Sequence, residues 1–302
     1  MKLSEYLEKT EILIDKLIGR HKNVSNSTSL IAFRGENRDY GPTKLMPSLF
    51  RNPEYVLKEK YLFELLGDYS FLQKGQERNI EKAIEAQHYV GISRMLDITF
   101  CLLTAIFFAC SGEKNEDGIV YIFCFPKHYS PHSQYIEDFY SRVLENNNIS
   151  YPSNFKVISH SYSNDRIKAQ KGGFIFYPGK DYRAIPNIYY EKICIDRNDK
   201  VNILKELDLV FNMNEATIFP EKERIIDVIR SKFNESIYQN YSITINGEIE
   251  AYFERINYEL NLKTFENDIE LIRFLRKEKD DLIFYVRTYC RMNDDLKTDL
   301  KK

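Results

Sequence analysis

The sequence predicts an α+β fold: a mixed, mostly antiparallel sheet of about five short strands, with flanking helices and one buried apolar helix. Two observations predict this fold. Between residues 1 and 233, short apolar runs of strand length are interspersed with segments whose apolar residues recur at helical spacing. From residue 234 to residue 302 the pattern is mainly helical, which predicts a C-terminal helical extension to an α+β domain of residues 1–233.

The first predicted helix has apolar residues at helical spacing, with charged residues between them: Leu3, then Tyr6 or Leu7, then Leu13 or Ile14, and then Leu17. Two later helices begin at a proline, which suits a first turn because the missing N–H would have no partner there. Residues 98–110 are apolar on every side, so this helix is expected at the centre of the domain. The predicted helices span residues 3–18, 53–69, 77–89, 98–110, 133–147, 199–211 and 219–233.

The predicted strands are short and rich in β-branched and aromatic residues. They span residues 30–33, 118–125, 155–160, 173–178 and 191–196. In the extension, Asn246 and Gly247 predict the turn of a hairpin that leads into a helix, because this pair favours two-residue turns. Residues 265–292 predict one long helix or two.

Composition narrows the class of protein. The net charge is −2, so no general electrostatic field favours nucleic acid, and such a partner is not expected. The five cysteines form no C-x-x-C pair, and four of them lie in apolar runs, which favours reduced, buried thiols in a cytoplasmic protein. The apolar run 98–110 is shorter than the roughly 20 residues that cross a bilayer, and no membrane partner is expected.

The first candidate site segment follows the first predicted strand. Arg34 and Gly35 stand at its end, and Arg51 follows a polar loop. A guanidinium at a strand end can hold a phosphate or carboxylate in a planar fork, and glycine permits close approach of the backbone. The alternative is that Arg34 pairs with a buried acid and braces the loop.

The second segment runs from Gln87 and His88 through Arg94 to Asp97, where the apolar helix is expected to begin. Asp97 or Thr99 is predicted to cap that helix. An anionic ligand could occupy the same helix N-terminus beside Arg94. His88 is a candidate base, with a hydrogen-bonded structural histidine as the alternative.

The third segment contains Arg166 and Gln170, which run from a polar turn into a strand. The amide of Gln170 can both donate and accept hydrogen bonds. The fourth segment contains Phe219 and Pro220 and is interpreted as structural. No metal-binding group is predicted, because His128 and His132 are separated by a segment with Pro131 that opposes a helix.

Together these segments resemble the FRG domain. The motifs are F-R-G and P-S-L-F-R, then Q-H-Y-x-G-x-x-R-M-L-D-x-T, then R-I-x-A-Q-x-G-x-F, then I-F-P-E, in that order over roughly residues 20–233. Ser93 and Ile98 stand where the family commonly has threonine and tryptophan. The resemblance implies a shared pocket, and by association a role in conflict between bacteria and phages.

Two functions follow as hypotheses. In the first, Arg34, Gly35, Arg51, Gln87, Arg94 and Arg166 bind an anionic, nucleotide-like ligand, and Asp97, His88 and Gln170 carry out catalysis. That enzyme would be an ADP-ribosyltransferase-like protein or glycohydrolase with NAD as its candidate cofactor. In the second, the same pocket is a non-catalytic sensing module, and the C-terminal helices contact a protein partner. Nucleic-acid processing ranks third. The chain has no G-x-x-x-x-G-K-[ST], G-x-S-x-G or H-E-x-x-H motif, which disfavours the chemistry of those motifs.

Overall fold

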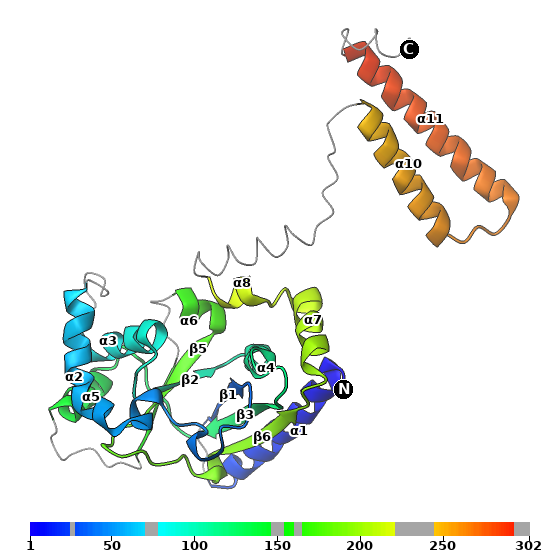
Figure 1. Ribbon diagram of the computed structural model, residues 1–302. Helices are drawn as coiled ribbons and strands as arrows, with labels where there is room; N and C mark the ends of the chain where they lie inside the picture. The colour runs from blue at the N-terminus through cyan, green and yellow to red at the C-terminus, as the bar shows by residue number, and fades with distance from the viewer. Residues whose placement is uncertain (25–27, 70–77, 146–153, 160–164, 221–244, 293–302) are drawn as a thin grey trace. The chain divides into compact units, whose positions relative to one another are not determined.

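The computed structural model describes the chain except residues 25–27, 70–77, 146–153, 160–164, 221–244 and 293–302 (Figure 1). The chain divides into two compact units, Met1–Lys232 and Phe233–Lys302. The first unit contains the sheet and the second is a pair of helices, so the fold is α+β as predicted.

One sheet lies at the centre of the first unit, with every neighbouring pair of strands antiparallel. Its order is β4-β5-β2-β1-β3-β6, so the described residues form six strands where about five were expected. The strands are β1 (Leu30–Glu36), β2 (Met95–Thr99), β3 (Gly118–Phe125), β4 (Lys156–Ile158), β5 (Gly172–Phe176) and β6 (Tyr190–Ile195).

The additional strand, β2, corrects the predicted helix over residues 98–110. The buried apolar helix exists, but it begins at Leu102, and Met95–Thr99 pair with β5 instead. Asp97 and Thr99 alternate with apolar residues in β2, but the apolar residues of the strand are followed directly by those of the helix, so the sequence shows no loop between the two elements.

Helices lie beside the sheet in the first unit (Figure 1). The start of α2 shows the expected signals: Pro53 occupies the first turn, and the side chain of Asn52 accepts the Glu54 N–H at 3.0 Å. The helices are α1 (Leu3–Lys22), α2 (Pro53–Asp68), α3 (Asn79–Glu85), α4 (Leu102–Cys110), α5 (Gln134–Leu144), α6 (Asp165–Gln170), α7 (Lys200–Phe211) and α8 (Glu215–Ile218).

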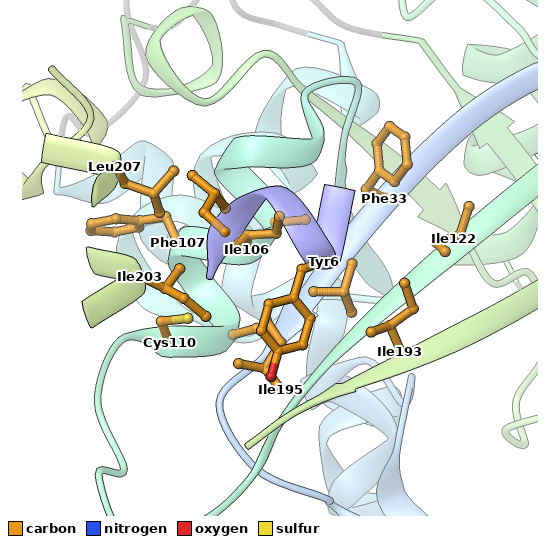
Figure 2. Packing of buried hydrophobic residues seen from close by; sticks show 14 of the residues in the cluster. Tyr6, Phe33, Ile106, Phe107, Cys110, Ile122, Ile193, Ile195, Ile203 and Leu207 are labelled. Atoms are coloured by element: carbon orange, nitrogen blue, oxygen red, sulfur yellow. The ribbon is translucent and has the colours of Figure 1, made fainter. Parts of the chain in front are cut away.

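The helices pack on one face of the sheet, in two apolar clusters. One cluster joins α1, α4 and α7 to β1, β3 and β6, with Phe33, Ile122 and Ile193 as strand residues (Figure 2). The other joins α2, α3, α5 and α6 to the remaining strands through residues such as Met95 and Phe176. We call this side of the sheet the helix face.

The opposite side of the sheet is covered by loops rather than helices. Ala32, Leu96 and Tyr121 belong to a third cluster that is closed by residues such as Leu45 and Ile185. We call this side of the sheet the loop face. Because successive side chains of a strand point to opposite faces, every second residue of each strand points toward the loop face.

β1 and β2 separate soon after they meet. Their only described residue pair is Phe33 with Thr99, whereas β1 pairs with β3 along its whole length. The divergence opens a gap between two central strands, next to Arg34 and Asp97.

The second unit is a helical hairpin of α10 (Ile245–Leu262) and α11 (Asp268–Met292). The predicted turn at Asn246 and Gly247 is wrong, because both residues lie in the first turn of α10. The side chain of Glu278 on α11 accepts hydrogen bonds from Tyr252 at 2.8 Å and Arg255 at 2.5 Å on α10. Most of the predicted helix 219–233, and residues 234–244, lie outside the described residues.

None of the described helices has the length and apolarity needed to span a bilayer. Cys110 and Cys124 are buried, but Cys194 is exposed, so the prediction of a buried thiol at Cys194 is wrong. Its strand β6 lies at the edge of the sheet, where alternate side chains face outward.

Candidate functional site

A cavity of about 200 Å³ lies at the divergence of β1 and β2. It brings together Arg34 and Gly35 of β1, Asp97 of β2, Gln87 from the turn after α3, and Arg166 and Gln170 of α6. We call it the Arg34 cavity. Its lining residues are Phe33, Arg34, Gly35, Gln87, Asp97, Ile98, Thr99, Phe108, Arg166 and Gln170.

The guanidinium of Arg34 bridges the gap between the two strands. Its Nε donates to Oε1 of Glu36 at 3.0 Å, and its Nη1 donates to the backbone carbonyl oxygen of Asp97 at 2.8 Å. No described residue accepts a hydrogen bond from Nη2. The predicted buried acid partner therefore exists, and part of the donor fork stays uncommitted.

Arg34 and the carboxylate of Asp97 begin on opposite faces of the sheet. Arg34 alternates with Gly35 and so leaves β1 on the loop face, with Ala32. Asp97 leaves β2 on the helix face, with Met95. For this reason the guanidinium contacts the backbone of Asp97 and not its carboxylate.

The carboxylate of Asp97 pairs with an amide. Nε2 of Gln87 donates to Oδ2 of Asp97 at 2.6 Å. A carboxylate only accepts, so the amide nitrogen must face it and Oε1 of Gln87 is left over. Both Oε1 of Gln87 and Oδ1 of Asp97 are buried and have no hydrogen-bond partner among the described residues. Two unpaired acceptors thus line the same cavity as Arg34.

Asp97 does not cap a helix, which corrects the predicted role. It lies in the middle of β2, and α4 begins five residues later. Thr99 has a role close to the predicted one, since its Oγ1 accepts the Cys101 N–H at 3.0 Å just before α4. No helix N-terminus is therefore available at Asp97 to hold an anion.

Gly35 is explained by the packing of α4 on β1. A Cβ on Gly35 would lie 1.9 Å from the carbonyl oxygen of Ala105 and 2.7 Å from the nitrogen of Ala109. Both are backbone atoms of α4 and cannot move aside. The glycine lines the Arg34 cavity, and its structural task is to let the helix approach the strand.

Gln170 and Arg166 form another wall of the cavity. Nε2 of Gln170 donates to the carbonyl oxygen of Ile218 at 3.3 Å, which ties α6 to α8. The guanidinium of Arg166 lies 5.1 Å from the ring centroid of Phe219, and that ring packs edge-on against Phe108. Phe219 was expected to be structural and here borders the site.

Arg94 lies outside the cavity, in a buried network. Its Nε donates to both oxygens of Glu59, at 2.8 and 2.9 Å, and its Nη1 donates to the carbonyls of Tyr177 and Gly179, at 2.8 and 3.1 Å. The hydroxyl of Tyr140 donates to Glu59 at 2.6 Å. Burial alone would lower the pKa of Arg94, but the adjacent Glu59 carboxylate raises it. Arg94 is thus occupied by the fold, and its predicted ligand contact finds no geometric support.

Two other predicted residues do not line the cavity. Arg51 is exposed, with its guanidinium 5.6 Å from the ring centroid of Tyr40. His88 lies in the π-helical turn Ala86–Val90, and its side chain is outside the described part of the structure. Gly91 ends this turn at a φ of +72°, a conformation that glycine adopts without strain.

Glu36 and Tyr121 are buried polar residues beside Arg34 that the sequence reasoning missed. Glu36 is 4% exposed, and its Oε2 has no partner among the described residues. The hydroxyl of Tyr121, opposite Arg34 on β3, is also buried without a described partner. Burial and the nearby Glu36 raise the pKa of this hydroxyl. Glu36 stands two residues after Arg34 in a strand, so period-two alternation could have indicated the pair.

The described residues contain no group of three histidine, cysteine, aspartate or glutamate side chains placed to hold a metal ion. The donors of the Arg34 cavity are nitrogen atoms, and its free acceptors are one amide and one carboxylate oxygen. Such a set suits a polar organic ligand better than a metal ion.

Comparison with known proteins gives one family match. Residues 29–118 match the FRG domain. The chain is also similar to the chloroplastic ATP synthase subunit b of Cryptomeria japonica, at 30% identity over 95 residues. That alignment covers 30% of this chain and 47% of the plant protein, so the chain spans about half the length of that relative. No solved structure matches the chain. The segment that is similar to the FRG domain contains Arg34, Gly35, Gln87 and Asp97, four of the residues that line the Arg34 cavity.

Proposed function

We propose that the Arg34 cavity binds an anionic, nucleotide-like small molecule. One observation carries the proposal: an arginine with an uncommitted Nη2 shares a cavity with two buried, unpaired acceptors, Oδ1 of Asp97 and Oε1 of Gln87. Unpaired buried polar atoms are rare in folded proteins and costly unless a ligand or water pairs with them.

The two kinds of free group define the ligand. Nη2 of Arg34 favours an anionic oxygen, while the two acceptors need N–H or O–H donors. Phosphate and ribose hydroxyl groups together supply both. The cavity of about 200 Å³ is smaller than the roughly 300–1,000 Å³ of sites for drug-sized ligands. It suits one part of a nucleotide, such as its ribose, with the rest outside.

A thermal-shift screen of the full chain against nucleotides, cyclic nucleotides, NAD and short nucleic acids tests this proposal. We expect a nucleotide to raise the melting temperature of the wild type and to act more weakly on Arg34→Lys, which keeps the charge but loses the fork. Arg51→Lys is the matched control because Arg51 lies outside the cavity. A flat screen, or an Arg34→Lys protein with the full shift, contradicts the proposal.

A second candidate is an NAD-using transferase or glycohydrolase. It is favoured by the placement of a carboxylate, Asp97, in the same cavity as an arginine. In such an enzyme Arg34 would bind the pyrophosphate. Asp97 would stabilise the oxocarbenium-like ribose while nicotinamide leaves and an acceptor or water attacks. Gln170 is a weaker candidate for catalysis because its amide nitrogen already binds the Ile218 carbonyl.

Incubation with labelled NAD and candidate acceptors separates the two candidates. Nicotinamide release or label transfer that is lost in Asp97→Asn would support the enzyme. A nucleotide that stabilises the protein and emerges unaltered would support a non-catalytic sensor.

The FRG resemblance adds a role in phage conflict to the proposal. This role predicts that expression of the wild type, but not Arg34→Lys, reduces phage plaques.

We also propose that the C-terminal unit contacts a protein. Phe253 on α10 and Ile272 and Phe284 on α11 are exposed apolar residues, at 56%, 48% and 72% exposure. Two amphipathic helices bury little apolar surface by themselves. A second copy is the first partner to test, because it presents the same apolar face. Light scattering of the full chain over a range of concentrations should show self-association that Phe284→Glu weakens, and a monomer throughout contradicts it.

A further inference from the structure

A second cavity, of about 180 Å³, lies at the edge strand β4. It shares no lining residue with the Arg34 cavity. Among its lining residues are two lysines, Lys127 and Lys156, and the rings of Tyr129, Phe155 and Tyr189. No acidic residue lines it, so the charge of its described wall is positive. We call it the edge cavity.

Lys156 is a buried cation without a described anionic partner. It is 5% exposed, and its Nζ lies 5.0 Å from the ring centroid of Phe139, 5.9 Å from Tyr135 and 6.0 Å from Tyr129. Lys156 forms no ion pair with the described carboxylates. Residues 146–153 and 160–164, which flank this part of the chain, contain no aspartate or glutamate. The rings offset part of the desolvation cost, and a bound anion would offset the rest.

Lys127 adds a second cation at the same ring. Its Nζ lies 5.0 Å from the centroid of Tyr129, so the two ammonium groups are no further apart than the sum of their distances to that ring. Tyr129 is held in place beside β4: its N–H donates to the Val157 carbonyl at 2.8 Å, and its carbonyl accepts the Ser159 N–H at 2.9 Å. Two cations that line one cavity, with no acidic residue among its lining residues, attract an oxyanion.

The other wall of the edge cavity is aromatic. The rings of Phe125, Phe155 and Tyr189 pack against one another, with centroids 5.4 to 6.2 Å apart. Phe155 and Tyr189 are only partly buried, so part of each ring is accessible. These rings pack with the loop-face cluster, whereas Lys156 packs with rings on the helix face. A ligand at this edge can therefore meet cations on one side and flat apolar rings on the other.

We propose that the edge cavity binds a phosphate-bearing ligand with a planar ring, of the mononucleotide class. The phosphate lies between Lys127 and Lys156, and the ring stacks on Phe155 and Tyr189. Lysine supplies point charges for phosphate oxygens, and aromatic rings accept any planar base. This site is separate from the Arg34 cavity. The edge cavity presents two lysines and no acidic residue, whereas the Arg34 cavity combines arginine with two unpaired acceptor oxygens.

Calorimetric titration of the full chain with AMP, adenosine and inorganic phosphate tests the proposal. AMP is expected to bind more tightly than either fragment, because only AMP engages both walls. Lys127→Met and Lys156→Met are each expected to weaken AMP binding by roughly tenfold or more, since each removes a charge-assisted contact. Lys127 is exposed, so its variant keeps the test usable if Lys156→Met does not fold.

Two controls separate this site from the other cavity and from general charge effects. Lys205→Met removes an exposed lysine of α7 and should leave AMP binding unchanged. Arg34→Lys, which keeps the charge in the other cavity but loses the fork, tests whether AMP binds there instead. Loss of AMP binding in Arg34→Lys but not in Lys127→Met would overturn the edge site and assign AMP to the Arg34 cavity. Absence of AMP binding, equal binding of phosphate and AMP, or full binding in both lysine variants would overturn the proposal as well.

Discussion

Nη1 of Arg34 lies 2.8 Å from the backbone carbonyl oxygen of Asp97 and so connects β1 to β2 where the two strands separate. Nε of the same residue pairs with Glu36, which is 4% exposed. Arg34→Ala should therefore lower the free energy of unfolding by roughly 3 kcal/mol, because it leaves a buried carboxylate unpaired. Arg34→Lys keeps one of the two contacts and should lose about 1 kcal/mol. Urea denaturation measures both.

The combination of stability and binding separates the two interpretations of Arg34. A folded Arg34→Lys protein that loses nucleotide binding supports the ligand fork. If Arg34→Ala and Arg34→Lys are both as stable as the wild type, the bracing contact is wrong. If Arg34→Ala unfolds and Arg34→Lys binds as the wild type does, the arginine is purely structural.

Gly35→Ala should destabilise the protein by at least about 3 kcal/mol, because the new Cβ would lie 1.9 Å from the Ala105 carbonyl oxygen. The contact is with the backbone, so the helix must move as a unit. Gly19→Ala is the matched control: Gly19 lies in α1 with nothing within 4 Å of the added Cβ. There alanine should stabilise the protein by roughly 0.5–1 kcal/mol. Equal effects of the two substitutions on thermal unfolding would contradict the packing argument.

The sequence predicts the fold class well where local signals are strong. Residues 118–125 form β3 over the predicted range, and α2 begins at Pro53 as expected. The boundary between β2 and α4 could not be read, because the apolar residues of both elements form one run over residues 95–110 that only Asp97, Thr99 and Thr104 interrupt. Asn246 and Gly247 predict a turn from two neighbouring residues alone. The packing of α10 against α11 favours a helix there instead, and it outweighs the local preference for a turn.

The candidate site shows what residue type alone leaves open. Arg34 and Arg94 both follow or begin apolar runs, yet one lines a cavity and the other is enclosed by Glu59. Glu59 lies 35 residues before Arg94 in the sequence, and no local sequence pattern marks it as buried. Tertiary packing alone pairs it with Arg94. Glu36 was within reach of sequence reasoning, since it shares a strand face with Arg34.

Arg94→Met should cost about 3–5 kcal/mol of unfolding free energy, because it leaves the Glu59 carboxylate buried and unpaired. The double variant Arg94→Met/Glu59→Met should recover part of the loss, since no charge is then left alone. Arg51→Met serves as the control and should change stability by no more than about 0.5 kcal/mol, because Arg51 is exposed. A double variant less stable than the sum of the two single losses would argue against an ion pair as the source of the cost.

Buried tyrosines should limit stability at alkaline pH. Burial raises the pKa of Tyr140 and Tyr177 well above the usual value and raises that of Tyr182 to about 12. A raised folded pKa means that this stability is complete below the unfolded pKa of about 10 and falls as pH rises further. Each such tyrosine costs up to about 1.4 kcal/mol per pH unit in that range.

This pH dependence is measured by following tyrosinate absorbance and far-ultraviolet circular dichroism together through an alkaline titration. Part of the tyrosinate signal should appear in one cooperative step that coincides with loss of the dichroism signal. A gradual titration of every tyrosine with the fold intact would contradict burial of these hydroxyls.

Asp97→Asn should separate ligand binding from stability at the Arg34 cavity. The asparagine keeps one oxygen to accept from Gln87, so the free energy of unfolding should change by about 1 kcal/mol or less. Its amide nitrogen then replaces Oδ1 in the cavity and presents a donor where the ligand also presents one. The nucleotide with the largest thermal shift should therefore bind roughly tenfold more weakly to Asp97→Asn. Asp165→Asn, at an exposed residue of α6 paired with Lys168, is the control and should bind normally. An Asp97→Asn protein with unchanged affinity would mean that Oδ1 of Asp97 meets no ligand donor, and the cavity would then have to recognise its ligand through Arg34 alone.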